Sequence, residues 1–381
     1  MSKIDDLIAK HCPDGVEHVA LSKVAGYSRT RVDAADLDGT TFTGVDNLVA
    51  EKGGRVDATY APNTARITAY EPGDVLLGNI RPYLKKVWLA THHGGCSGDV
   101  LAIRILPEHR ERLEPEFLYY LLSSDSFFAY NMQHAKGAKM PRGNKQAIID
   151  FRIPVPPLEV QREIVRVLDQ FTQLEAELEA ELEARRQQYA YYRDQLLAES
   201  KRYASIQPLG ALADVNWGDT NTTKSAYVSD GERYLAFSAA GPDGYLDHYD
   251  YDRSAVVLSA IGALAGKTWR ASGKWSCIKN TIRFFSRDES VVTTEYLYWV
   301  TSVPGFWPRR GSAQPFIAKG DADKIEIPVP PLEEQKRITD ILDKFDALVN
   351  DLSSGLPAEI AARRQQYEHY RDRLLTFKEA A

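Results

Sequence analysis

The longest regular pattern in the chain is a stripe of hydrophobic and aromatic residues that begins after Pro157. Its members lie three or four positions apart, except for one longer step in which Arg185 takes the expected place; they are residues 164, 168, 171, 174, 178, 182, 189, 192 and 196. This period is that of an amphipathic α-helix close to a heptad repeat. Pro156, Pro157 and Glu159 form a helix-start signal, and no glycine or proline interrupts residues 158–200. The pattern predicts one helix that is roughly 60 Å long.

A second stripe of the same kind supplies a partner for this helix. It runs through Ile338, Ile341, Leu342, Phe345, Leu348 and Leu352, and it resumes at Ile360, Tyr367, Tyr370 and Leu374. Because residues 353–357 contain Gly355 and Pro357, we expect a break or kink between the two parts. A helix that joins two globular domains returns beside its partner most simply as an antiparallel pair, with a pseudo-twofold axis that relates the domains. The alternative is a coiled coil that only dimerises the protein.

Both stripes belong to an internal duplication. Residues 153–159 recur unchanged as 327–333, and the segments 168–171, 184–189 and 192–197 return as 342–345, 362–367 and 370–375. The regions before each helical block are more faintly similar: residues 75–90 align without gaps on 256–271, and Cys96 falls on Cys277 at the same offset of 181. Nearly identical helical blocks beside diverged globular blocks suggest one shared scaffold task and two different recognition tasks.

The globular blocks have the pattern of α+β domains. Short β-type runs occur at residues 74–77, 87–90 and 100–105, and again at 255–258 and 281–285, and helical stretches follow at 115–123 and 294–302. The chain therefore divides into a globular domain (1–152), a helical spacer (153–203), a second globular domain (204–326) and a second helical spacer (327–381).

Polar, basic loops that contain glycine follow these helical stretches, at residues 137–146 and 309–314. They offer Arg, Lys, Asn and Gln, the side chains that hydrogen-bond to the edges of guanine and adenine. Glycine also allows the backbone to approach a phosphate closely. The loops therefore predict contacts with nucleic acid, and the alternative is that they are ordinary surface loops.

The distribution of charge supports this interpretation more than the total does. The net charge of −6 argues weakly against nucleic acid. However, seven cations and no acidic residue lie between Arg253 and Arg287, and residues 75–98 and 136–145 hold three and four cations, again without an acid. Acidic residues gather elsewhere, as in the five glutamates of residues 175–183. Phosphates respond to local potential; the alternative for each stretch taken singly is a solvated face.

Composition excludes several classes of protein. An apolar content of 44% with 26% charge over 381 residues is typical of a soluble protein with two or three domains. No stretch is long and apolar enough to span a bilayer, and residues 1–14 lack the layout of a secretion signal. Three cysteines without a Cys-x-x-Cys pair argue against a disulfide scaffold or a zinc ribbon. We therefore expect a cytoplasmic protein.

Two motifs resemble nucleotide or metal sites and fail on spacing. Residues 262–268 look like the P-loop of an ATPase, but three residues rather than four separate the glycines, so we interpret the segment as a strand, a turn and a strand. His92 and His93 with Cys96 lack further ligands for zinc. The sequence contains neither a Gly-x-Ser-x-Gly motif nor the Asn/Asp-Pro-Pro-Tyr/Phe tetrapeptide of adenine methyltransferases. We expect no catalytic centre, metal or cofactor in this chain.

The repeated blocks resemble the two conserved regions of type I restriction-modification specificity subunits. The resemblance rests on residues 153–161 and 327–335, on the Leu-Asp-x-Phe and Arg-Arg-Gln-Gln-Tyr blocks, and on residues 73–76 and 80–86, and it covers essentially the whole chain. It implies two target-recognition domains that each read one half of a split, asymmetric DNA site, while the helix pair sets the unread spacer. It also implies two methyltransferase subunits that use S-adenosylmethionine and restriction subunits that use ATP. A stand-alone DNA-binding regulator or scaffold without such partners is the alternative.

The resemblance and the basic loops together indicate the site residues. The candidates for phosphate or base contacts are Arg81, Lys85, Lys86, Lys139, Arg142 and Lys145 in the first half, and Lys267, Arg270, Lys274, Arg309, Arg310 and Gln314 in the second. The candidates for methyltransferase contacts lie on the helical blocks and are Tyr189, Arg193, Tyr367 and Arg371. The alternative for these four is packing within the helix pair.

Overall fold

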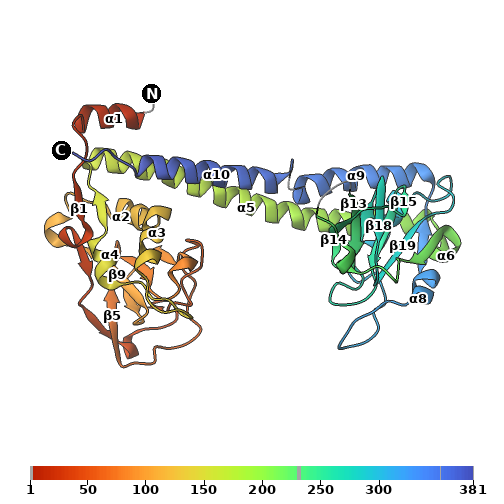
Figure 1. Ribbon diagram of the computed structural model, residues 1–381, viewed down its shortest axis with the longest axis horizontal. Coiled ribbons are helices and arrows are strands. Elements are labelled where there is room, and N and C mark those ends of the chain that lie inside the picture. Colours follow the sequence, from red (N-terminus) through yellow and green to blue (C-terminus); the bar gives the residue numbers. More distant parts are fainter. Residues whose placement is uncertain (1–2, 230–232, 352, 381) are drawn as a thin grey trace. The chain divides into compact units, whose positions relative to one another are not determined.

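The chain folds into two compact units of mixed α and β structure (Figure 1). The computed structural model describes residues 3–229, 233–351 and 353–380, so Leu352 of the predicted stripe lies outside the described residues. Unit 1 comprises Met1–Glu177 and Ile360–Ala381, and unit 2 comprises Leu178–Glu359. The predicted α+β class with two related domains is confirmed.

The helices and strands are as follows. The α-helices are α1 (Lys3–His11), α2 (Pro115–Leu122), α3 (Asp125–His134), α4 (Lys145–Asp150), α5 (Leu158–Ser200), α6 (Leu209–Leu212), α7 (Thr294–Thr301), α8 (Lys319–Lys324), α9 (Leu332–Asn350) and α10 (Leu356–Leu374). The strands of unit 1 are β1 (His18–Ala20), β2 (Ala25–Tyr27), β3 (Arg31–Asp33), β4 (Phe42–Thr43), β5 (Arg66–Tyr70), β6 (Val75–Gly78), β7 (Val87–Leu89), β8 (Gly94–Cys96), β9 (Val100–Ile105) and β10 (Arg152–Pro154). Those of unit 2 are β11 (Ser205–Pro208), β12 (Ala213–Trp217), β13 (Tyr234–Ser238), β14 (Gly241–Leu246), β15 (Tyr251–Asp252), β16 (Ala255–Ser259), β17 (Thr268–Ala271), β18 (Lys274–Cys277), β19 (Thr281–Ser286) and β20 (Glu326–Val329).

Both units contain the same four-stranded antiparallel sheet, in the order β2-β9-β6-β7 in unit 1 and β12-β19-β16-β17 in unit 2. The register also corresponds, because Val75 pairs with Ile103 in unit 1 and Val256 with Phe284 in unit 2. Each unit adds a second sheet, β3-β5-β8-β4 or β14-β13-β18-β15, and a two-stranded sheet, β1-β10 or β11-β20. The faint sequence repeat therefore reflects a repeated fold.

The start of each helical block is anchored in the core of its own unit. Ile164 and Leu168 of α5 are completely buried against α2 and the sheet of unit 1, and Ile338 and Leu342 of α9 are completely buried in the core of unit 2. Burying one such side chain stabilises the fold by roughly 1.5–3 kcal/mol. The hydrophobic stripe is thus used first to attach each helix to its domain.

In unit 1, the first half of α5 packs antiparallel to α10 (Figure 1). The ring of Phe171 stacks on that of Tyr370, with 5.7 Å between the ring centroids. One turn further along α5, Glu175 accepts a hydrogen bond from Arg364, which lies earlier in α10. Contacts that advance along one helix and retreat along the other define an antiparallel pair.

In unit 2, the second half of α5 packs against α9 in the same way. The ring of Phe345 stacks on that of Tyr192 at 5.9 Å, and Leu197, further along α5, joins a core cluster with Ile338, which lies earlier in α9. The interruption predicted at 353–357 is confirmed, because α9 ends at Asn350 and α10 begins at Leu356. The antiparallel pairing is therefore confirmed within each unit, and the pseudo-twofold axis between the units stays a prediction.

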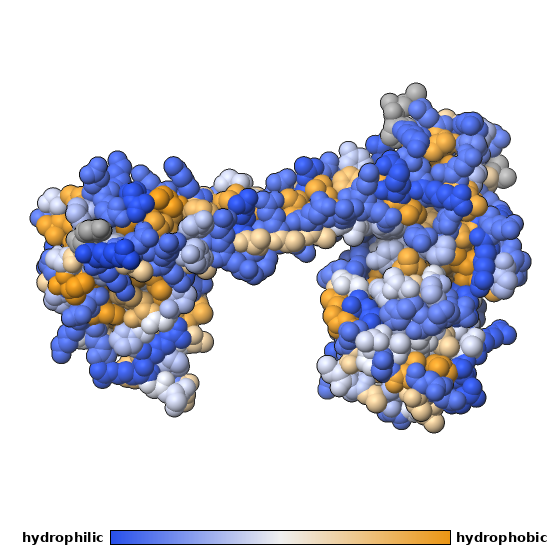
Figure 2. Space-filling view, turned by 180° about the vertical axis from the view of Figure 1, so that it is seen from behind, coloured by the Kyte–Doolittle hydropathy of each residue, from blue (hydrophilic) through white to orange (hydrophobic). Residues whose placement is uncertain are grey.

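On the face shown in Figure 2, both units are mostly hydrophilic, with small hydrophobic patches among polar side chains. Over the described ranges of the chain, the helices include none that is both long enough and apolar enough to cross a membrane. Several aromatic side chains of the helical blocks are exposed, above all Tyr191, whose exposed fraction is 64%.

Candidate nucleic-acid interface

The two predicted loops are hairpins of the same construction. Residues 136–142 form hairpin 1, in which the backbone groups of Lys136 and Arg142 donate hydrogen bonds to each other at 2.9 and 2.8 Å. Residues 310–316 form hairpin 2, in which Arg310 and Phe316 make the same pair of bonds at 2.9 and 2.8 Å. Each hairpin closes a turn that projects exposed side chains, which is the geometry expected of a reading loop.

Glycine and proline at matching positions determine this local fold. Gly137 and Gly311 follow the first residue of each hairpin and have φ angles of 103° and 78°, which favour glycine. A Cβ atom at Gly311 would lie 2.8 Å from the carbonyl oxygen of Gln314, so a side chain there would also clash with the turn. Pro141 and Pro315 precede the last residue and have no N–H group to satisfy.

Each hairpin is fastened to the end of a central strand. In unit 1, the N–H of Arg81 donates to the carbonyl of Pro141 at 2.7 Å, and in unit 2 the N–H of Gly262 donates to that of Pro315 at 2.9 Å. Arg81 has a φ of 52°, which is left-handed and uncommon for a residue with a side chain. The segments after β6 and β16 therefore hold the two hairpins in equivalent places.

Four predicted residues of unit 1 lie on or beside hairpin 1. Lys139 is exposed in the turn, Arg142 ends the hairpin, and Arg81 is exposed next to it. Lys145 is not in a loop as predicted, because the side chain of Asn144 accepts hydrogen bonds from two backbone N–H groups and so starts α4 at Lys145. The helix start leaves the Lys145 side chain exposed.

Lys86 and Lys85 point into the protein. The ammonium group of Lys86 donates to the carbonyl of Val45 at 2.8 Å. That of Lys85 lies 2.9 Å from the carboxylate of Asp125, which also pairs with Lys52 at 3.2 Å and with Arg371 at 2.6 Å. Burial alone would raise the pKa of Asp125, but the hydrogen bond from Lys85 and the charges of Lys52 and Arg371 outweigh it and hold that pKa below its ordinary value. Lys85 is therefore part of a partly buried ionic cluster.

In unit 2, three candidates lie at hairpin 2. Arg309 and Gln314 are exposed, and Arg310 forms an ion pair with Asp321 at 2.5 Å. A Cβ atom at Gly266 would lie 3.2 Å from Nε of Arg309, so the 262–267 turn and the hairpin are neighbours. This turn joins β16 to β17, which confirms the strand-turn-strand interpretation of the P-loop-like segment.

The other three candidates of unit 2 lie on β17, β18 and the turn before β17. Lys267 and Lys274 are exposed and lie over the rings of Trp269 and Tyr249, at 5.6 and 4.7 Å. Arg270 instead forms an ion pair with Asp343 of α9 at 2.5 Å and lies over the ring of Trp299. Arg270 thus links the sheet to the helical block.

Two of the four methyltransferase candidates, Tyr367 and Tyr189, pack within the helix pairs, which was the alternative interpretation, whereas Arg371 contacts Asp125 of α3. Tyr367 of α10 lies 6.0 Å from Phe171, and Tyr189 of α5 lies 6.5 Å from Phe345. The side chain of Arg193 is 13% exposed and pairs with Asp194. Arg371 is only 1% exposed, which leaves it no surface for a direct contact with another subunit.

Two buried glutamines were missed by the sequence reasoning. Gln161 of α5 accepts a hydrogen bond from the N–H of Glu114 and donates to the carbonyls of Arg112 and Pro156. Gln335 of α9 makes the same three contacts, with the N–H of Thr293 and the carbonyls of Val291 and Pro330. Glu114 and Thr293 cap α2 and α7, so each glutamine joins a domain helix to its helical block. Their identity in both repeats was the available signal.

Cys96 and Cys277, which lie at equivalent places in the repeat, are both buried free thiols. Burial raises the pKa of the Cys96 and Cys277 thiols to about 12, so both stay protonated at neutral pH. The described residues contain no group of three or more histidine, cysteine or acidic side chains that could hold a metal ion. The ring of His92 lies beside the carbonyl of Thr40 at 3.0 Å.

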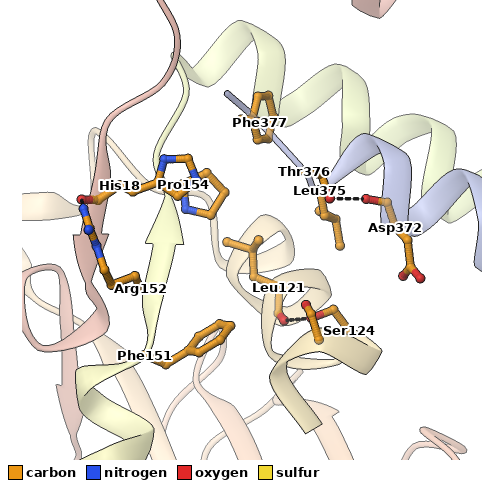
Figure 3. A pocket seen from close by; sticks show the side chains of 11 residues that line it. His18, Leu121, Ser124, Phe151, Arg152, Pro154, Asp372, Leu375, Thr376 and Phe377 are labelled. Carbon is orange, nitrogen blue, oxygen red and sulfur yellow. Dashed lines mark hydrogen bonds between the residues drawn. The ribbon is translucent and has the colours of Figure 1, made fainter. Parts of the chain in front are cut away.

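A pocket of about 350 Å³ lies in unit 1, beside the segment that follows α10 (Figure 3). Its lining includes Ser124, Arg152 and Asp372, and none of the predicted DNA-binding residues. Figure 3 shows Arg152 beside His18, to whose carbonyl it donates at 2.7 Å, and it also pairs with Glu379. The cation of this pocket is thus already engaged within the unit.

Comparisons with known proteins agree with the repeated architecture. The family model described as "Type I restriction modification DNA specificity domain" matches residues 96–184 and 214–362. A putative type I restriction enzyme specificity subunit of Haemophilus influenzae is 32% identical over 291 residues, which are 70% of this chain and 74% of that protein. The EcoR124I/EcoR124II specificity subunit of Escherichia coli is 33% identical over 59% of this chain and 63% of its own length.

Solved structures share the fold across nearly the whole chain. A structure from work on complex assembly and conformational transition of the type I restriction-modification system has a TM-score of 0.60 at 22% identity and covers 95% of this chain and 98% of its own. The specificity subunit from M. genitalium has a TM-score of 0.58 at 13% identity and covers 94% and 96%. With the family model matched in both halves, the chain belongs to the family of type I restriction-modification DNA specificity subunits.

Proposed function

We propose that each unit reads one half of a split, asymmetric DNA site. The observation that carries this proposal is the repetition of one hairpin frame with different exposed side chains, since an identical frame can present two sets of hydrogen-bonding groups to DNA. The target-recognition domains are residues 1–152 and 204–326. Exposed cations such as Arg81, Lys139 and Arg309 contact phosphates and set the register, and the other exposed hairpin side chains contact bases.

The helical blocks, residues 153–203 and 327–381, serve as the spacer between the two readers. Two heads that read one face of a duplex lie about one helical turn apart, on the order of 34 Å. A pair of packed helices is stiff enough to keep such a distance constant. The length of the unread DNA between the half-sites then follows from the helices rather than from the loops.

The partners are two methyltransferase subunits, which use S-adenosylmethionine, and restriction subunits, which use ATP. This chain directs them to DNA in the cytoplasm and performs no catalysis itself. The exposed aromatic side chains of the helical blocks are Tyr191, Tyr192 and Tyr370. They are better suited to contact the methyltransferase than the less exposed Tyr189, Tyr367, Arg193 and Arg371, because aromatic side chains that lose water on binding dominate many interfaces.

A stand-alone regulator without methyltransferase partners is not supported by the comparisons, which name specificity subunits. Sequencing of DNA methylation in the host, with and without this gene, tests the proposal. A two-part motif with methylated adenine should be present only when the gene is present. DNA binding without any gene-dependent methylation would instead favour a regulator.

A further inference from the structure

A second pair of matching turns lies beside the hairpins. The turn 97–99 precedes β9 in unit 1, and the turn 278–280 precedes β19 in unit 2. The carbonyl of Asp99 accepts a hydrogen bond from the N–H of Asn79 at 2.8 Å, and that of Asn280 accepts one from Ala260 at 3.0 Å. Asp99 and Asn280 are thus equivalent, as are the residues that end the hairpins, Arg142 and Phe316.

In unit 1, the two equivalent positions hold a carboxylate and a guanidinium group in contact. Nε of Arg142 donates to Oδ1 of Asp99 at 3.1 Å, and Nη2 lies 3.5 Å from Oδ2. Nη1 has no hydrogen bond within the described part of the chain, and the Arg142 side chain is 53% exposed. A guanidinium group held along one edge keeps its free end available for two parallel hydrogen bonds, the geometry that fits O6 and N7 of guanine.

In unit 2, the same positions hold an amide and an aromatic ring. Asn280 has a left-handed φ of 72°, and its side chain hydrogen-bonds to no group in the described residues. Phe316 is 38% exposed. Asn280 is among the residues that line a hollow of about 330 Å³, together with Lys279 and Leu264. An asparagine amide fits N6 and N7 of adenine, and an apolar ring fits the methyl group of thymine.

We propose that Arg142, oriented by Asp99, reads a G·C base pair in the first half-site, and that Asn280 and Phe316 read an A·T base pair in the second. This inference rests on the proposed function and adds the base pair that each unit selects. Asp99 acts by positioning: it orients the guanidinium group of Arg142 and does not itself contact the base. In unit 2 an arginine is not needed, because the free amide supplies both a donor and an acceptor.

The test uses the full chain assembled with its methyltransferase subunits and measures which sequences become methylated. Arg142→Ala should relax one position of the first half-site, with discrimination for G·C falling about ten- to hundredfold, and leave the second half-site unchanged. Arg142→Gln should shift the same position toward A·T, because glutamine fits adenine. Asn280→Ala should relax one A·T position of the second half-site only.

Arg112→Ala is the matched control. Arg112 forms an ion pair of similar exposure with Glu17 at 3.0 Å, outside the hairpin, so its loss should leave both half-sites unchanged. A methylated two-part motif that keeps every position in Arg142→Ala and Asn280→Ala overturns the inference while the proposed function stands. If the unaltered chain directs no methylation to any two-part motif, the proposed function itself is wrong.

Discussion

The same arginine of the repeated helical block has different roles in the two units. In unit 1, Arg371 is buried to 1% exposure and contacts Asp125, the first residue of α3. In unit 2, the equivalent Arg193 hydrogen-bonds to its neighbour Asp194 and lies over the ring of Tyr189, both on its own helix. The described residues between α7 and α8 form no helix that corresponds to α3. A repeated side chain therefore acquires its energetic role from the variable domain packed against it.

The residues packed beneath the two hairpins also differ: they are polar in unit 1 and apolar in unit 2. In unit 1, Gly143 lies at the base of hairpin 1, where a Cβ atom would meet the amide oxygens of Asn131 and Asn79 at 2.6 and 2.8 Å. In unit 2, the equivalent places are taken by Ile317 and Ala260, both completely buried. The same backbone hydrogen bond joins the pair in each unit. The N–H of Gly143 donates to the carbonyl of Asn79, and the N–H of Ile317 donates to that of Ala260. Hairpin 1 thus packs against the buried amides of Asn79 and Asn131, and hairpin 2 packs through the buried apolar residues Ile317 and Ala260.

The largest predicted effect tests this difference. Ile317→Ala removes most of a completely buried side chain and should lower the free energy of unfolding of unit 2 by about 2–5 kcal/mol. Gly143→Ala should cost unit 1 less, about 1–3 kcal/mol, because the two amides must move to admit one methyl group. Denaturant unfolding followed by hydrogen exchange in each unit measures both. Equal losses of unfolding free energy would show that the packing beneath the two hairpins does not differ.

A second prediction tests whether the two units lose equal stability when their equivalent glutamines are replaced. Gln161→Leu and Gln335→Leu each remove the side-chain partner of three part-buried or buried backbone groups and should each cost about 2–3 kcal/mol. Because their contacts match, the two losses should agree to within about 1 kcal/mol and should appear in α2 and α7 respectively. Hydrogen exchange of these two helices is the measurement. A loss in only one unit would mean that the glutamines are not equivalent.

The regular elements could be predicted because their signals are local. The period of the stripe indicated α5 at residues 158–200, and the Gly-Pro interruption indicated the gap between α9 and α10. The roles of Lys85 and Arg371 could not be predicted, because Asp125 lies outside the repeated blocks and 246 residues from Arg371. The equivalence of the hairpins was visible as glycine and proline four residues apart at 137 and 141 and at 311 and 315. A search for cations alone passes over that pattern, and it also passes over Asn280 and Phe316.

The third prediction tests whether the neighbouring domain determines the energetic role of the repeated arginine. Arg371→Ala removes one cation from a partly buried cluster, and the loss for unit 1 should be about 2 kcal/mol, less than for a fully buried pair because Asp125 is 37% exposed. Arg193→Ala should cost less than about 1 kcal/mol, since its partner Asp194 is 59% exposed. Thermal unfolding of the two variants, with hydrogen exchange of α3, distinguishes them. If Arg193→Ala were the more damaging, the neighbouring domain would not determine the role of this arginine.

The smallest effect concerns one charge in the hairpins. Lys139 of hairpin 1 corresponds to Ala313 of hairpin 2, because each is the fourth residue of its frame. A lysine that contacts one phosphate releases about one counterion, so Lys139→Ala should reduce the slope of log affinity against log salt by about 0.9. Ala313→Lys should increase the slope by a similar amount and bring unit 2 closer to unit 1. Fluorescence anisotropy of the assembled methyltransferase on a specific duplex, at several salt concentrations, measures both slopes. Neither variant should alter the bases selected, because a phosphate contact carries no sequence information; a changed base preference in Lys139→Ala would assign this lysine to base reading instead.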